Sequence, residues 1–167
     1  MTVLFKNCGP VPVDKILSIV MPAMTIMKEQ GLNQFGFRGK VNKSGMIDYG
    51  ERAVKTELSS WNFWREGFED GLLMSYVNEY SNYQIGRIRL MRIPSRTCYT
   101  WHRDPTPRLH IPLITHSSAF IIVQEQSKHL PCGSLWWVNT MVNHTAINCH
   151  DKDRWHLVYE VSFSPNS

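Results

Sequence analysis

Apolar residues recur at helical spacing near the start of the chain and alternate with polar residues over its second half. From Val13 to Lys28 an apolar position returns every three or four residues, which predicts a helix with one buried face. That face would consist of Ile16, Val20, Ala23 and Met27. Pro22 interrupts the pattern and predicts a kink or a division of the helix. A second helical pattern follows, with the shared face Phe68, Leu72, Tyr76 and Tyr80.

Residues 31–50 follow neither periodicity, because they contain five glycines and few apolar anchors. We expect a long loop there. A loop of that length is often functional or mobile, so it could close over a site as a lid or remain an ordinary surface loop.

After about residue 84 the chain consists of short β-rich runs separated by proline, glycine, serine and asparagine. The runs are IGRIRLMRI, RTCYTWH, RLHIPLI, AFIIVQE, SLWWVN and RWHLVYEVSF. Regular short strands with turn signals between them predict a sandwich or barrel. The length of 167 residues allows one domain with a real core. We therefore expect a single domain over 1–167, with a helical and loop part at 1–83 and a jelly-roll-like β core at 84–164.

The composition adds few constraints, since 43% hydrophobic and 19% charged residues are ordinary for a soluble globular protein. The net charge of +4 is too small to indicate nucleic-acid binding without a basic cluster. The basic residues of GRIRLMRIPSR (86–96) alternate with apolar ones, which predicts the solvent-exposed face of a strand.

The expected compartment is reducing and cytoplasmic. The four cysteines show no CxxC pair, so neither a disulfide framework nor a cysteine zinc site is predicted. The N-terminal segment lacks the charged start and apolar run of a signal peptide. The run ILSIVMPAMTIM contains Pro22 and falls well below the roughly 20 residues that span a bilayer, so no membrane segment is expected.

The stretch WHRDPTPRLH (101–110) concentrates residues that can bind a metal. His102 and Asp104 stand two positions apart, so on an extended strand their side chains share a face. With one more histidine from downstream, His144, they would form the two-histidine, one-carboxylate facial triad of non-haem Fe(II) oxygenases. Arg154, ten residues beyond His144, could bind a carboxylate through two parallel hydrogen bonds, which suits a dicarboxylate cosubstrate.

Each part of this pattern has an ordinary explanation when taken alone. An HxD pair can belong to the polar face of a strand, His144 can be a hydrogen-bonded loop residue, and Arg154 can be a solvated charge. The order of the three parts and their β context favour the metal site. The remaining histidines are predicted to be surface or structural residues: His116, His129, His150 and His156.

From about Gly86 to Val161 the sequence resembles the Fe(II)- and 2-oxoglutarate-dependent dioxygenases, and within them the aspartyl/asparaginyl β-hydroxylase-like group, which includes proline-hydroxylase-type relatives. The resemblance is carried by IPSRTCYTWH, by RLHIPL, and by a glycine eleven residues before His144 and an arginine ten residues after it. It implies a double-stranded β-helix of the jelly-roll or cupin-like type, mainly β, with the N-terminal helices packed against it.

The same resemblance implies roles for individual residues. His102 and His144 would be iron ligands, and Arg154 would bind the distal carboxylate of 2-oxoglutarate. His110 would hold the cosubstrate near its keto-acid end, and Arg108 would face the cosubstrate or a substrate carboxylate. The mammalian-type members that give the group its name have glycine where this chain has Asp104. The chain therefore aligns with relatives that carry the full triad, such as amino-acid hydroxylases.

The implied activity is hydroxylation of a C–H bond in an amino acid or a peptidyl residue. Fe(II), 2-oxoglutarate and O2 would take part, and succinate and CO2 would be by-products. Nucleic-acid demethylating dioxygenases have a similar triad. They resemble a pattern in which a second arginine follows six positions after the one that matches Arg154, and this chain has Glu160 there. We therefore expect a small-molecule or peptide substrate. Two further alternatives are a non-catalytic cupin-like binding domain and, with less support, a zinc hydrolase, which would not require Arg154.

Overall fold

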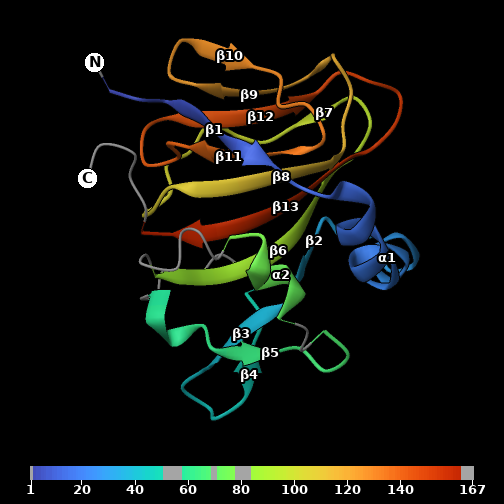
Figure 1. Cartoon of the computed structure of the whole chain (residues 1–167), viewed down its shortest axis with the longest axis vertical. Coiled ribbons are helices and arrows are strands. Elements are labelled where there is room, and N and C mark those ends of the chain that lie inside the picture. The colour runs from blue at the N-terminus through green and yellow to red at the C-terminus, as the bar shows by residue number, and fades with distance from the viewer. Residues whose placement is uncertain (1, 51–57, 69–70, 78–83, 163–167) are drawn as a thin grey trace.

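Two antiparallel sheets face each other and form a jelly-roll core, as the strand pattern predicted (Figure 1). The computed structural model describes residues 2–50, 58–68, 71–77 and 84–162. The larger sheet contains, in spatial order, β1 (Phe5–Pro10), β11 (Ser134–Val138), β8 (Arg108–Ile114), β13 (Arg154–Val161), β6 (Ile85–Ile93) and β2 (Gln34–Gly36). The smaller sheet contains β10 (Gln126–Lys128), β9 (Ala119–Val123), β12 (His144–Asn148) and β7 (Thr97–Cys98).

The larger sheet has one apolar face that packs against the helix α1 (Val13–Glu29), which lies beside the sheet in Figure 1. The helix is the one predicted from the spacing, and its buried residues are Ile16, Val20, Ala23, Met24 and Met27. It continues through Pro22 without division. Pro22 and Ser18, whose carbonyl loses its helical partner, both lie on the exposed face, where water can satisfy that carbonyl.

The opposite face of the larger sheet points toward the smaller sheet. Part of the space between them is filled by an apolar cluster drawn from both sheets, which includes Ile93, Trp136, Ile121 and Val123. The rest is the cavity described below. This division arises from the period of two along each strand, because successive side chains point to opposite faces.

The N-terminal part differs from the predicted arrangement of helices and loops. β1 pairs with β11 and β2 pairs with β6, so both extend the larger sheet. Residues 31–50, predicted to be loop, also contain β3 (Arg38–Val41) and β4 (Ile47–Asp48), which form a third sheet with β5 (Phe63–Trp64). Such strands are stabilised by partners distant in sequence, which local periodicity does not reveal.

The second predicted helix is also shorter than its pattern. The described part of that segment contains only α2 (Leu72–Ser75), a short 3-10 turn precedes it at Leu58–Ser60, and Tyr80 lies outside the described residues. In the described part of the chain, no helix is both long and apolar enough to cross a membrane.

Candidate metal centre

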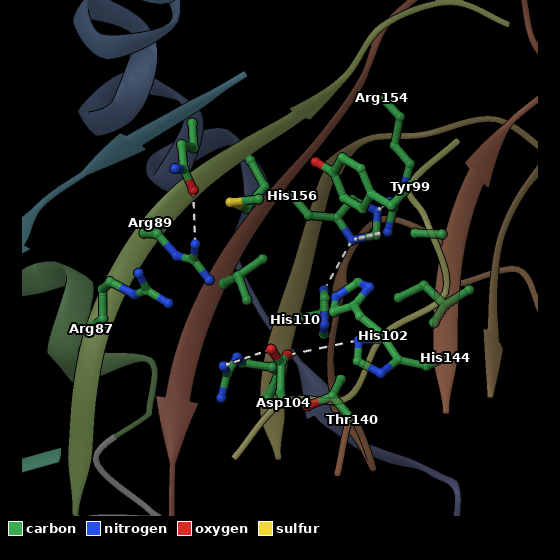
Figure 2. Close-up of a pocket in the computed structure, with 16 residues that line it drawn as sticks. Arg87, Arg89, Tyr99, His102, Asp104, His110, Thr140, His144, Arg154 and His156 are labelled. Atoms are coloured by element: carbon green, nitrogen blue, oxygen red, sulfur yellow. Dashed lines mark hydrogen bonds and ion pairs between the residues drawn. The ribbon is translucent and has the colours of Figure 1, made fainter. Parts of the chain in front are cut away.

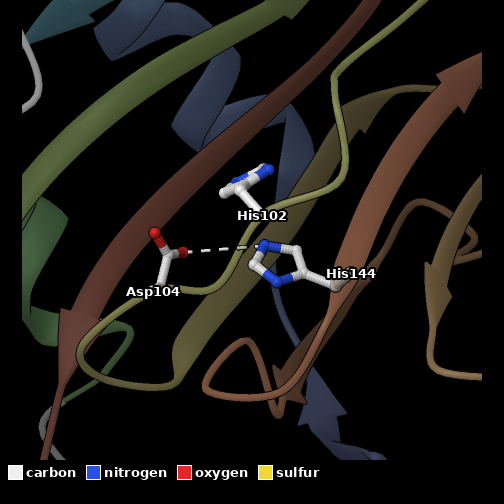
Figure 3. A group of neighbouring side chains, drawn as sticks. All are labelled: His102, Asp104 and His144. Atoms are coloured by element: carbon white, nitrogen blue, oxygen red, sulfur yellow. Dashed lines mark ion pairs between the residues drawn. The ribbon is translucent and has the colours of Figure 1, made fainter.

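His102, Asp104 and His144 lie together at one end of the cavity between the sheets (Figure 3). Their potential ligand atoms are all within 4.8 Å of one another. His144 begins β12, whereas His102 lies outside the regular strands and joins β12 through an isolated antiparallel bridge. The RTCYTWH run therefore forms a strand only at Thr97–Cys98, and the bridge brings the first ligand to the second.

Backbone hydrogen bonds fix the spacing of the three residues. The amide of His102 donates to the carbonyl of His144 over 3.0 Å, and the amide of His144 donates to the carbonyl of His102 over 2.9 Å. The amide of Asp104 donates to the carbonyl of Thr140 over 2.8 Å. The two segments that carry the ligands are thus tied together at each ligand position, so the site is preorganised by the backbone.

Both histidines are oriented by hydrogen bonds from the ring nitrogen that faces away from the cluster. Nδ1 of His102 lies 2.7 Å from the carbonyl oxygen of Thr100, and Nδ1 of His144 lies 3.1 Å from that of Val142. A carbonyl only accepts, so each Nδ1 carries the proton and each Nε2 keeps a lone pair for a metal. Burial lowers the pKa of His144 below its usual value, which favours the neutral ring that a metal requires.

Asp104 completes the cluster and is itself held by an arginine. Its Oδ2 lies 3.7 Å from Nε2 of His144, and its Oδ1 lies 3.3 Å from Nη2 of Arg108. The same Arg108 nitrogen lies 3.2 Å from Oε1 of Glu160, which also accepts a 2.6 Å hydrogen bond from Nη2 of Arg87. One carboxylate oxygen of Asp104 therefore faces the cluster while the other is bound to a buried cation.

The cavity has a volume of about 260 Å³ and contains all six residues singled out from the sequence (Figure 2). They are His102, Asp104, Arg108, His110, His144 and Arg154. Alternate side chains of two neighbouring strands supply half of the remaining lining. On β6 these are Arg87, Arg89 and Met91, and on β13 they are His156 and Val158 beside Arg154.

Arg154 is 4% exposed and contacts a histidine rather than a carboxylate. Its Nε lies 2.9 Å from Nε2 of His156, and its Nη2 lies 2.8 Å from Nδ1 of the same ring. Burial lowers the pKa of Arg154 to about 10. Within the described residues no ion pair neutralises this guanidinium, so it is a buried cation that an anionic ligand could stabilise.

His110 lies between the metal cluster and Arg154 on the floor of the cavity. Its Nδ1 is 3.5 Å from Nδ1 of His156, and its Nε2 is buried without a hydrogen-bond partner among the described residues. Burial, followed by the charge of Arg154, lowers the pKa of His110 well below its usual value. A buried polar atom without a partner is rare in native proteins, so it marks a position where a ligand can bind.

Two arginines that the sequence reading assigned to a solvent-exposed strand face are part of this site. Arg87 is buried and Arg89 is partly buried, and both line the cavity. The prediction for residues 86–96 was wrong at these positions because the apolar alternate residues face α1, which turns the basic face inward. The period-two argument that placed Arg108 and His110 together would have found this face if β6 had been assigned to the same sheet.

The other histidines divide into two groups. His156, predicted to be surface or structural, is buried in the cavity against Arg154. His116 and His150 stack on each other outside it, with ring centroids 3.7 Å apart, and His129 contacts the carbonyl of Ala119. Glu160, the position where nucleic-acid demethylating relatives have arginine, is buried between two arginines.

Comparison with known proteins identifies a family and a structural similarity that extends over most of the chain. A model of the aspartyl/asparaginyl β-hydroxylase family matches residues 71–163. AviO1 from Streptomyces viridochromogenes Tue57 is 13% identical, with a TM-score of 0.59 over 97% of this chain and 90% of its own. A cupin domain from Bordetella pertussis Tohama I is 21% identical over 45% of this chain and 79% of its own, with a TM-score of 0.40. No curated protein matches the chain. At 13% identity the similarity to AviO1 shows a shared fold alone.

Proposed function

Because the chain belongs to the aspartyl/asparaginyl β-hydroxylase family and is therefore a hydroxylase-type oxygenase, we propose that it is an Fe(II)- and 2-oxoglutarate-dependent dioxygenase. The reaction would hydroxylate a C–H bond of an amino acid or a peptidyl residue. The observation that carries this proposal is the cluster of His102, Asp104 and His144, whose ligand atoms lie within 4.8 Å of one another in a cavity that the arginines of the larger sheet also line.

The chemistry of the donor set fits Fe(II). Two neutral imidazoles and one carboxylate on one side of an ion leave its other positions available, which is the arrangement of non-haem Fe(II) oxygenases. A structural zinc site would instead be closed by four protein ligands. The hydrogen bonds from Nδ1 of His102 and His144 would keep both rings in the orientation that metal binding needs.

The cavity also fits a dicarboxylate cosubstrate. Arg154 would bind the distal carboxylate, because its guanidinium is buried and its only hydrogen-bond partner among the described residues is the ring of His156. His110 would donate from Nε2 to the end of the cosubstrate that lies nearer the metal, which would satisfy the atom that now lacks a partner. These two residues fix the cosubstrate's orientation along the cavity.

When bound, Fe(II) and 2-oxoglutarate supply the activation of O2, and 2-oxoglutarate is converted to succinate and CO2. The chain's own contribution is to hold the ligands in place and to exclude water from the reaction. Apolar side chains from both sheets close the walls between the polar groups. They are Met91, Ile121, Ala146 and Val158. Such walls strengthen the electrostatic contacts inside the cavity and protect the oxidising step from side reactions.

The proposal is tested by reconstituting the metal-free protein with Fe(II) and measuring succinate formed from 2-oxoglutarate in air. We expect turnover that requires Fe(II) and is abolished in His144→Ala, while His129→Ala, which removes a histidine outside the cavity, retains it. Succinate release by His144→Ala at the rate of the unaltered protein would refute the assignment of the metal centre. A folded protein that binds Fe(II) but releases no succinate would instead favour a non-catalytic binding barrel.

A further inference from the structure

The charges that line the cavity do not balance, and the imbalance is located at two arginines. Four arginines line it, whereas the carboxylates that pair with them among the described residues are Asp104 and Glu160. Both carboxylates are bound at one place. Oε1 of Glu160 accepts from Nη2 of Arg87 over 2.6 Å and lies 3.2 Å from Nη2 of Arg108, which also pairs with Asp104.

Arg89 and Arg154 are left with neutral partners. Nη1 of Arg89 donates to the side-chain oxygen of Gln34 over 2.8 Å, and Arg154 contacts the ring of His156. Within the described residues neither arginine forms an ion pair. Removing a cation from water is unfavourable unless an anion or good hydrogen bonds compensate for it, so each arginine is a position prepared for an anion.

The two arginines lie at different levels of the cavity. In the register of the larger sheet, Arg89 on β6 is opposite Val158 on β13. Arg154 lies four residues before Val158 on β13, where it is opposite Ile93. Four residues of strand span roughly 13 Å. Figure 2 shows Arg89 on the β6 side of the cavity and Arg154 beside Tyr99, above His102 and His144. A five-carbon dicarboxylate bound to Arg154 would therefore leave Arg89 facing the remaining part of the cavity.

The surroundings of Arg89 disfavour its positive charge, which an anion bound beside it would stabilise. The pKa of Arg89 is lowered to about 9, first by burial and then by the charges of Arg87 and Arg108, which Glu160 and Asp104 offset only in part. An anion bound there would relieve both the loss of solvation and the repulsion between like charges. Gln34 beside it adds an amide that can orient the bound group.

We propose that Arg89 binds a carboxylate of the substrate, and that the substrate is a carboxylic acid of about amino-acid size. This inference rests on the proposed function, because Arg89 is available to the substrate only if the cosubstrate occupies Arg154. The size follows from a cavity of about 260 Å³ that must hold both molecules. Arg108, which the sequence resemblance gave as a possible substrate contact, already pairs with two carboxylates, so Arg89 is the better placed of the two.

The test is calorimetric and does not depend on turnover. Protein loaded anaerobically with Fe(II) and 2-oxoglutarate is titrated with the twenty L-amino acids, with their carboxamides, and with a capped peptide that carries an aspartyl side chain. We expect at least one free acid to bind and its carboxamide to bind about a hundredfold more weakly. Arg89→Gln should lose that acid preference and keep its affinity for 2-oxoglutarate. Arg89→Lys, which retains the charge, should keep part of the preference for the acid over the carboxamide.

Arg96→Gln is the matched control, because Arg96 is an exposed arginine at the other end of the same basic segment. It should bind as the unaltered protein does. The proposal is overturned if Arg89→Gln binds the acid unchanged, if acids and carboxamides bind alike, if no free acid binds, or if only the capped peptide binds. A loss of 2-oxoglutarate affinity in Arg89→Gln would assign this arginine to the cosubstrate instead. Failure of the unaltered protein to bind 2-oxoglutarate at all would refute the proposed function, a separate result.

Discussion

At the scale of single residues, the site depends on neighbours that orient the metal-binding groups. Two backbone carbonyls set the ring orientation of His102 and His144, and Arg108 holds one oxygen of Asp104 while the other faces the cluster. Arg108 is a positioning residue in this arrangement. Its burial at 2% exposure means that no water competes effectively for the contact.

Replacing Arg108 should therefore weaken metal binding without removing a ligand. We expect Arg108→Gln to raise the dissociation constant for Fe(II) about 10- to 100-fold, because Asp104 loses the partner that fixes its orientation. Glu160 would keep its contact with Arg87, which limits the damage to the fold. Competition with a chelator measures the constant, and Arg103→Gln, an exposed neighbour, is the control. Equal metal affinity in the two variants would show that Arg108 does not position the ligand.

Arg154 should act on the cosubstrate rather than on the metal. We expect Arg154→Ala to weaken 2-oxoglutarate binding by about 2–5 kcal/mol, because a buried carboxylate would lose its charged partner. Metal affinity should stay near that of the unaltered protein. Calorimetry of the Fe(II)-loaded protein under anaerobic conditions measures both quantities. An unchanged dissociation constant for 2-oxoglutarate would mean that another residue binds the carboxylate.

At the scale of elements, the alternation of side chains along a strand explains why the site residues could be predicted and the inward face of β6 could not. The positions of His102, Asp104, His144 and Arg154 could be predicted because their spacing and order form a recognisable pattern, and the β core could be predicted from regular short runs. The inward direction of Arg87 could not be predicted, since a strand's sequence does not say which of its faces meets a neighbour. The direction is set by α1, because its apolar face packs against the alternate apolar residues of β6.

The edge strand β2 shows why residues 31–50 were harder to assign. Its Gly36 approaches the backbone of Tyr49 so closely that an added Cβ would lie 2.0 Å from the Tyr49 carbonyl oxygen. Here glycine permits β2 to lie close to the backbone that follows β4, and it does not mark a flexible loop. The high glycine content of the segment thus reflects close packing at this position, which composition alone does not distinguish from a loop.

Gly36→Ala should accordingly destabilise the protein by about 1–3 kcal/mol, because the backbone must shift to relieve the overlap. Gly71→Ala is the control, since a Cβ there would meet nothing within 4 Å and the backbone is right-handed, with φ at −57°. Denaturant unfolding of both variants measures the difference. If Gly36→Ala were as stable as Gly71→Ala, the close approach of β2 to Tyr49 would be wrong.

At the scale of the whole molecule, the cavity makes stability depend on pH. Burial, followed by the charge of Arg154, lowers the pKa of His110 and of His156 well below the usual 6.5. In the unfolded chain both rings would titrate near their ordinary value of about 6.5. The unfolded state therefore binds more protons below that pH. Stability is fully present above about pH 6.5 and is lost as the pH falls below it.

We expect the free energy of unfolding of the metal-free protein to fall on acidification through about pH 6, by up to about 1.4 kcal/mol per pH unit for each histidine. His156→Gln, which keeps an acceptor for Arg154, should show a shallower dependence because one of the buried titrating rings is gone. Denaturant unfolding at a series of pH values measures the slope. If the free energy of unfolding changed equally with pH in the unaltered protein and in His156→Gln, burial would not hold His156 neutral.

The central claim is that the three-residue centre and Arg154 together bind a metal and a dicarboxylate in one cavity. The most direct measurement is an anaerobic titration of the metal-free protein with Fe(II) and then 2-oxoglutarate, followed by visible absorption. We predict a weak charge-transfer band that appears only after both additions, is absent in His144→Ala, and needs more 2-oxoglutarate in Arg154→Ala. Absence of the band in folded protein that has bound Fe(II) would contradict the claim.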